Sequence, residues 1–151
     1  MKKMIMVALV AAAGLALSAG TGRSSLGFSL SSVRGTYAST SHGTADGTGT
    51  LIADGAGNIT GGTETVDDGG ADVCKGSLGG SYTVNPDGTG TLTVIFTTTA
   101  TISGACPSSP VTNHAAIVVV SPKRVEVSGT DPFLLESGSL TRQTPPDHDD
   151  D

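Results

Sequence analysis

Short runs of alternating hydrophobic and polar residues, separated by glycine-containing turns, fill most of the chain. The clearest run is 90–99, where Leu92, Val94 and Phe96 share one face and threonines occupy the other, with Ile95 as the exception. A period of two is typical of a strand with one buried face. Residues 111–120 form another long run, and its four successive β-branched residues at 117–120 favour a strand over a buried helix.

Turn signals separate these runs. Asp46-Gly47, Asp54-Gly55 and Asp87-Gly88 each supply a glycine that can adopt the positive φ angle of a tight reversal. The alternation and the turns together predict strands at 35–41, 49–53, 59–66, 76–84, 90–99, 111–120, 125–128, 133–136 and 138–142.

The predicted fold class is all-β, a single antiparallel up-and-down β-barrel of about eight strands over residues 35–143. Closing the sheet into a barrel removes the exposed edges that invite aggregation. A two-layer β-sandwich is the alternative, but it needs longer Greek-key connections than these successive hairpins provide.

The two ends of the chain differ from this pattern. Residues 1–19 have a basic start, an apolar run at 4–17 and small residues after it, which predicts a secretory signal peptide and a secreted or periplasmic bacterial protein. The apolar run is shorter than the ~20 residues that span a bilayer, so we expect no membrane span after signal removal. Residues 20–34 form a lead-in segment, and 144–151 are an acidic tail that we expect to be disordered.

Cys74 and Cys106 are the two cysteines of the chain. In an oxidising compartment an isolated pair predicts one structural disulfide. A redox-active pair usually has the Cys-x-x-Cys spacing, which is missing here.

The net charge of −6, the lack of a basic cluster and the absence of tryptophan make nucleic acid and anionic membrane surfaces poor candidates as partners. We expect no cofactor and no metal. The segments at 67–72 and 54–58 are rich in carboxylates, but neither has the ligand spacing of a calcium loop. His42 and His114 could form a metal site or an acid–base pair only if the fold brought them together, and His148 lies in the tail.

Several segments resemble a group of small, secreted, Gly/Thr-rich bacterial proteins that are thought to form β-barrels. The resemblance is carried by Gly35-Thr36-Tyr37, by the run Ala-Asp-Gly-Ala-Gly-Asn-Ile-Thr-Gly-Gly at 53–62, by Gly80-Ser81-Tyr82 and by Asp-Gly-Thr-Gly-Thr-Leu at 87–92. It implies a barrel fold. The group has no established active site, so the resemblance assigns no catalytic residue.

The expected function is that of an exported, non-catalytic β-barrel, a binding or structural module whose mouth could hold a small apolar ligand. Five residues are candidates to line that site, although the same residues would equally fill a dry core: Tyr37, Tyr82, Leu92, Val94 and Phe96. One alternative is a hydrolase or isomerase that uses a histidine and carboxylates such as Glu64, Glu126 and Glu136. Another is a surface protein that binds a partner through an open sheet edge.

Overall fold

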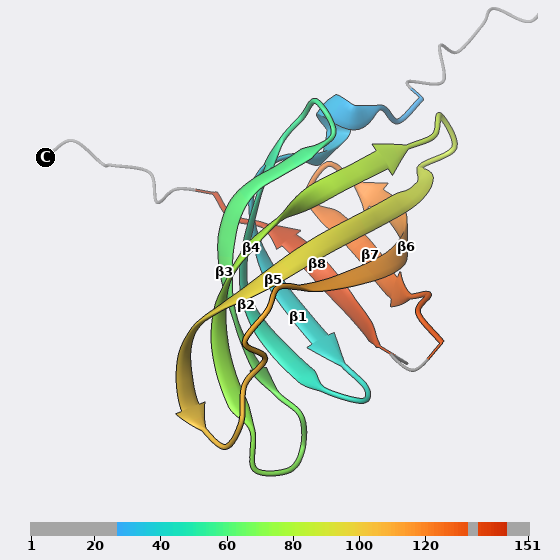
Figure 1. Ribbon diagram of the computed structural model, residues 1–151. Helices are drawn as coiled ribbons and strands as arrows, with labels where there is room; N and C mark the ends of the chain where they lie inside the picture. Colours follow the sequence, from blue (N-terminus) through green and yellow to red (C-terminus); the bar gives the residue numbers. More distant parts are fainter. Residues whose placement is uncertain (1–26, 133–135, 145–151) are drawn as a thin grey trace, which may run out of the picture.

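A closed antiparallel β-barrel forms the body of the protein (Figure 1). The computed structural model describes residues 27–132 and 136–144. A short 3-10 helix, η1 (Leu30–Val33), precedes eight strands, each of which pairs with its neighbours in sequence: β1 (Arg34–His42), β2 (Asp46–Asp54), β3 (Asn58–Asp67), β4 (Val73–Val84), β5 (Thr89–Ser103), β6 (Val111–Ser121), β7 (Arg124–Gly129) and β8 (Ser137–Arg142). The predicted all-β, up-and-down, eight-stranded barrel is confirmed.

The pairing of β1 with β8 closes the sheet. It runs from Tyr37 opposite Arg142 to His42 opposite Ser137, while the other edge of β1 pairs with β2. This ring contradicts the alternative of a sandwich. It also leaves none of the eight strands with the free edge that a strand-adding surface protein would need.

One end of the barrel is closed by η1 and packed with apolar side chains. Val33 is buried in the core at this end, and Phe28 and Leu30 of the lead-in segment pack against the core. The hydroxyl of Tyr82 lies 3.1 Å from the carbonyl oxygens of both Leu30 and Val33, to which it donates. We call this the closed end, and the opposite end, which carries the β1–β2 and β3–β4 connections, the open end (Figure 1).

The predicted strands differ from the observed ones mainly at their ends. β5 continues to Ser103, four residues beyond its predicted limit, and β4 begins at Val73. The predicted face of β5 is confirmed, because Leu92 and Phe96 are buried whereas Ile95 is 39% exposed. The predicted strand 133–136 lies outside the described residues except for Glu136, which precedes β8.

The disulfide between Cys74 and Cys106 is present, as predicted, and joins the start of β4 to the connection before β6. A structural disulfide indicates an oxidising, extracytoplasmic compartment. The expected signal peptide at 1–19 and nearly all of the expected tail at 144–151 lie outside the described residues. Among residues 27–132 and 136–144, no helix has the length and apolar character needed to cross a bilayer.

Candidate functional site

The inward-facing residues change from apolar to polar along the barrel. On β1 the inward sequence from the closed end is Tyr37, Ser39 and Ser41, and Ser39 is only 7% exposed. On β6 the buried Ile117 is followed towards the open end by Ala115 and Asn113. Serine and asparagine are seldom buried unless they have a polar partner, so their inward positions at one end alone indicate a site rather than a continuous core.

A register shift in β3 brings a carboxylate into the barrel. Ile59 faces inward, and simple alternation from it would direct Glu64 outward. The pairing of β3 with both neighbours shifts by one residue between Ile59 and Thr63, next to Gly61 and Gly62. An extra residue in one strand reverses the faces beyond it, so Glu64 lies inside.

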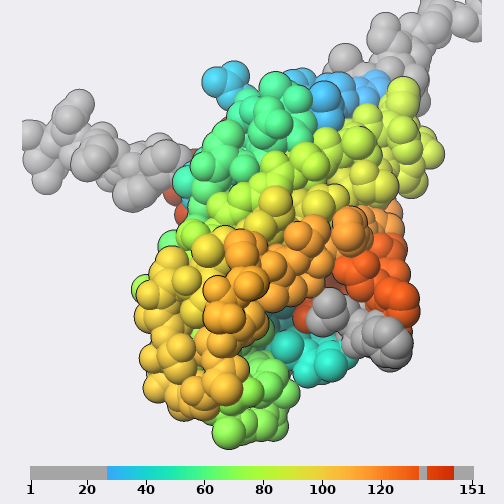
Figure 2. Space-filling view, viewed as in Figure 1, coloured from blue at the N-terminus to red at the C-terminus, as the bar shows by residue number. Residues whose placement is uncertain are grey.

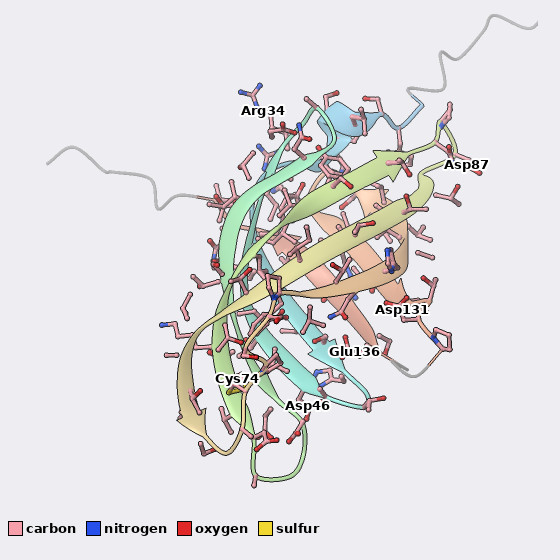
Figure 3. The ribbon with its side chains drawn as sticks, in the orientation of Figure 1. Arg34, Asp46, Cys74, Asp87, Asp131 and Glu136 are labelled. Atoms are coloured by element: carbon pink, nitrogen blue, oxygen red, sulfur yellow. A yellow bond between two sulfur atoms is a disulfide. The ribbon has the colours of Figure 1, made fainter. Side chains whose placement is uncertain are left out.

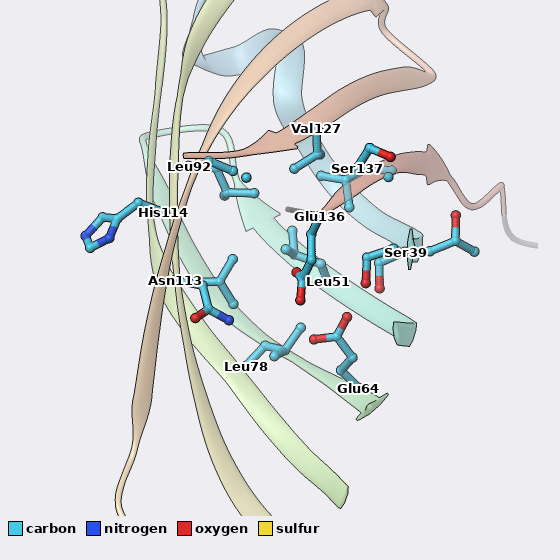
Figure 4. Close-up of a pocket in the computed structure, with 17 residues that line it drawn as sticks. Ser39, Leu51, Glu64, Leu78, Leu92, Asn113, His114, Val127, Glu136 and Ser137 are labelled. Carbon is cyan, nitrogen blue, oxygen red and sulfur yellow. The ribbon is translucent and has the colours of Figure 1, made fainter. Parts of the chain in front are cut away.

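Glu136 is the second inward carboxylate, and it lies immediately before β8. Figure 3 places it near the same end as Asp46 and Cys74, away from Arg34 and Asp87 at the closed end. In the close-up, the carboxylates of Glu64 and Glu136 point into the same space (Figure 4). The open end therefore holds two acidic groups from opposite sides of the barrel wall.

A cavity of about 100 Å³, which we call the inner cavity, extends from these carboxylates towards the middle of the barrel. Its apolar walls come from Leu51, Leu78, Leu92, Val94, Val127 and Leu140. An outer cavity of about 280 Å³ shares Ser41, Glu64, Asn113 and Glu136 with it and reaches the surface loops. Figure 2 shows an indentation where the orange residues of β6 and the preceding connection approach the cyan β1–β2 turn. The two cavities adjoin at the carboxylates.

The surroundings of Glu64 and Glu136 disfavour the charged form of both carboxylates. Burial, and in second place the negative charge of Glu136, raises the pKa of Glu64 to about 7. Burial also raises the pKa of Glu136. Within the described part of the chain, neither carboxylate receives a hydrogen bond or an ion pair, and no lysine or arginine lines either cavity. The site is therefore acidic and lacks a counter-charge of its own.

Two further polar atoms in the site have no partner among the described residues. They are the Oγ of Ser39 and the Oδ1 of Asn113, both buried and both belonging to residues that line the inner cavity. Buried polar atoms in proteins are almost always hydrogen-bonded. Their position beside the carboxylates means that the open end offers hydrogen-bonding capacity to a molecule that is not part of the fold.

The five predicted lining residues divide between the site and the core. Leu92 and Val94 line the inner cavity and Phe96 lines the outer one. Tyr37 and Tyr82 line neither, because both are buried towards the closed end. Whether any of the five contacts a ligand stays a prediction.

The histidines do not form a joint site. His42 pairs with Asp46, with 3.1 Å between Nδ1 and Oδ1. His114 pairs with Asp131 at the same distance, and its ring points away from the cavity, on the far side of its strand (Figure 4). Across 27–132 and 136–144, no three His, Cys, Asp or Glu residues come together as metal ligands.

The acidic turns are occupied by local hydrogen bonds. Asp54 accepts from the backbone N–H groups of Ala56 and Asn58 and from the Asn58 side chain, and these bonds lower the pKa of Asp54. Asp68 accepts from the N–H of Gly70 in the same way. These carboxylates stabilise turns, in contrast to Glu64 and Glu136.

Comparison of the chain with protein-family models, with curated proteins and with solved structures found no match. The function is therefore inferred from the geometry of the open end.

Proposed function

We propose that this protein binds a small molecule in the open end of its barrel, outside the cytoplasm, and that it is not an enzyme. The ligand's apolar part lies in the inner cavity against Leu51, Leu78 and Leu92, and its polar part lies where the two cavities adjoin. The observation that carries the proposal is a hollow, acidic open end in a barrel whose closed end is tightly packed.

The size of the barrel supports this assignment. Eight strands give an interior that side chains can just fill or that can hold one small ligand. A dry apolar cavity of roughly 150 Å³ in another protein admits benzene. The inner cavity alone, at about 100 Å³, is smaller, so a molecule of one or two rings would extend from it into the adjoining outer cavity of about 280 Å³. The leucines provide apolar contact, and Ser39 and Asn113 provide directional hydrogen bonds.

A second candidate is acid–base catalysis by the carboxylate pair. The raised pKa of Glu64, about 7, would let it carry a proton near neutral pH beside a second carboxylate, and paired carboxylates divide the roles of acid and base in this way. Such a pair would act without a histidine. His42 pairs with Asp46, and His114, although it is among the residues that line the inner cavity, pairs with Asp131 and turns its ring away. We prefer binding, since it accounts for the apolar wall as well as for the carboxylates.

Methyl-detected NMR with indole as the probe tests the binding proposal. We expect indole to shift the methyl signals of Leu51, Leu78 and Leu92 in a saturable way and to leave that of Val125, at the packed end, unchanged. Absence of a saturable shift at these leucines, or equal shifts at Val125, would contradict the proposal.

A matched pair of variants on β6 provides the control. Ala115 lines the inner cavity, and the next residue, Ala116, is exposed on the outer face. Ala115→Leu should fill the cavity and abolish the indole shifts, whereas Ala116→Leu should leave them intact. Binding that survives both substitutions would place the indole elsewhere.

A further inference from the structure

The carboxylates of the open end differ from the other perturbed carboxylates of the protein in what surrounds them. Asp54, Asp87 and Asp131 are held ionised by hydrogen bonds from neighbouring N–H or hydroxyl groups. Glu64 and Glu136 receive no such bond from the residues that the structure describes, and they face one another. Two partly buried carboxylates without a counter-charge are costly, and a ligand that carried positive charge would offset that cost.

Two glycines on the neighbouring strands lie next to the Glu64 side chain. Gly47 on β2 faces the Glu64 side chain, and a Cβ atom at Gly47 would lie 2.5 Å from Oγ of Ser41 and 2.7 Å from Oε1 of Glu64. Gly76 on β4 pairs directly with Glu64 on its other side. The two glycines offer no side chain to the carboxylate, and the Ser41 hydroxyl, which lines both cavities with Glu64, is the polar group beside it among the described residues.

Ser39 supplies an observation that is independent of the acidic pair. It is 7% exposed, it lines the inner cavity, and its Oγ has no partner in the described parts of the chain. Asn113 adds an unpaired Oδ1 from another strand, although its amide nitrogen is the atom nearer the carboxylates in Figure 4. The two carboxylates, once ionised, only accept hydrogen bonds and the Ser39 hydroxyl can accept one, so acceptors are in excess and match a ligand that carries several N–H donors.

We propose that the ligand is a primary amine with a small apolar body, and that its ammonium group lies between Glu64 and Glu136 while its body rests on Leu51, Leu78 and Leu92. An ammonium group has three donors and no acceptor, which suits two carboxylates and the hydroxyl oxygen of Ser39. This inference rests on the proposed function, because it assigns the chemistry of the molecule that occupies the open end.

The proton on Glu64 competes with such a ligand, so binding of an amine should strengthen as the pH rises through about 7. The ionisable side chains that line the two cavities with Glu64 are Glu136, Asp68 and Asp72, and also His114, whose ring points away from the inner cavity and pairs with Asp131. The flanking strands β2 and β4 present Gly47 and Gly76 to it. None of these groups would reverse the direction of the pH dependence.

Three probes with one indole body separate the charge from the apolar contact: tryptamine, which is cationic; tryptophol, in which a hydroxyl replaces the ammonium; and indole-3-acetate, which is anionic. Because the chain has no tryptophan, indole fluorescence excited beyond the tyrosine absorption band reports the probe alone. We expect tryptamine to bind at least about tenfold more tightly than tryptophol, and indole-3-acetate to bind most weakly, as one charge-assisted interaction predicts.

Variants then locate the charge effect. Glu64→Gln combined with Glu136→Gln should bring tryptamine and tryptophol to within about twofold of each other. Glu126→Gln, at a half-exposed residue whose carboxylate pairs with Arg124 and lines neither cavity, should keep the wild-type preference. A preference for tryptamine that persists in the double variant would overturn the assignment to these two carboxylates.

The results in the wild-type protein distinguish the two proposals without any variant. Equal affinity for tryptamine and tryptophol, with shifts at the inner-cavity leucines, would overturn the amine and leave the proposed function standing. Failure of all three probes to shift those leucines would overturn both.

Discussion

Tyr37 and Tyr82 are both buried in the core, but only the hydroxyl of Tyr82 has a hydrogen-bond acceptor among the described residues. They occupy equivalent positions in two similar sequence segments, Gly35-Thr36-Tyr37 and Gly80-Ser81-Tyr82. The difference arises from η1, whose carbonyl groups lie above Tyr82. One sequence pattern thus gives two tyrosines with different contributions to stability.

Tyr82→Phe should lower the free energy of unfolding by about 1–2 kcal/mol, because it removes a buried hydrogen bond that ties the barrel to its closing helix. Tyr37→Phe should change it by less than about 0.5 kcal/mol or should stabilise the fold, since the hydroxyl it removes is unpaired. Urea denaturation of both variants measures the difference. Equal losses in the two variants would contradict the assigned role of η1.

Glu64 should make the stability of the protein depend on pH. Its pKa in the folded protein is about 7, against 4.5 for the free group, so between these values the folded state holds a proton that the unfolded chain has released. Stability therefore falls as the pH rises through this range, by up to about 3 kcal/mol from Glu64.

Glu64→Gln removes this penalty. The variant should exceed the wild type in stability by about 2–3 kcal/mol near about pH 8 and should match it near about pH 4. Urea denaturation at a series of pH values gives the comparison. A variant that is less stable than the wild type at the higher pH would show that the ionised Glu64 has a stabilising partner.

Replacing both Cys74 and Cys106 with alanine should lower the free energy of unfolding by about 3–4 kcal/mol, because the bond closes a loop with a sequence separation of 32. The wild-type protein measured with a reducing agent should show a similar loss. If reduction and the double substitution gave very different values, the loss would come from packing of the side chains rather than from the covalent link.

Gly76 and Gly79 on β4 offer a test of packing in the wall of the barrel. A Cβ atom at Gly76 would overlap the ring of Phe96 and lie 2.8 Å from the carbonyl oxygen of Thr97, whereas at Gly79 no atom lies within 4 Å. Gly76→Ala should cost about 1–3 kcal/mol, and Gly79→Ala should stay within about 0.5 kcal/mol of the wild type. Thermal unfolding of the two variants checks the prediction, and equal stability would mean that Phe96 can move aside at no cost.

The barrel and the inward face of β5 could be predicted from the sequence because alternation and Asp-Gly turns are local signals, and Gly55 and Gly88 do adopt positive φ. The predicted turn at Asp46-Gly47 is wrong, because these two residues begin β2 and Gly47 has no positive φ. Glu64 could not be identified in this way. Its side chain lies inside only because the register of β3 shifts near Gly61-Gly62, and alternation counted from Ile59 gives the opposite face. Adjacent glycines within a strand are a signal for such a bulge, but they do not fix its position.

Glu136 could not be recognised for a different reason. Its position depends on the closure of β8 onto β1, a contact between residues about a hundred positions apart in the sequence. That the oxygens of Ser39 and Asn113 are buried without a partner likewise depends on the closed barrel, which brings distant strands together.

An even number of strands returns the polypeptide to the rim from which it set out, so β1 starts and β8 finishes at the end of the barrel that η1 closes (Figure 1). A linker attached before residue 27 or after residue 144 would therefore leave from the plugged side. Tethered to a sensor surface by either route, the protein would present its carboxylate-lined opening to the flowing solution, and dissolved amines could be assayed without obstruction by the attachment.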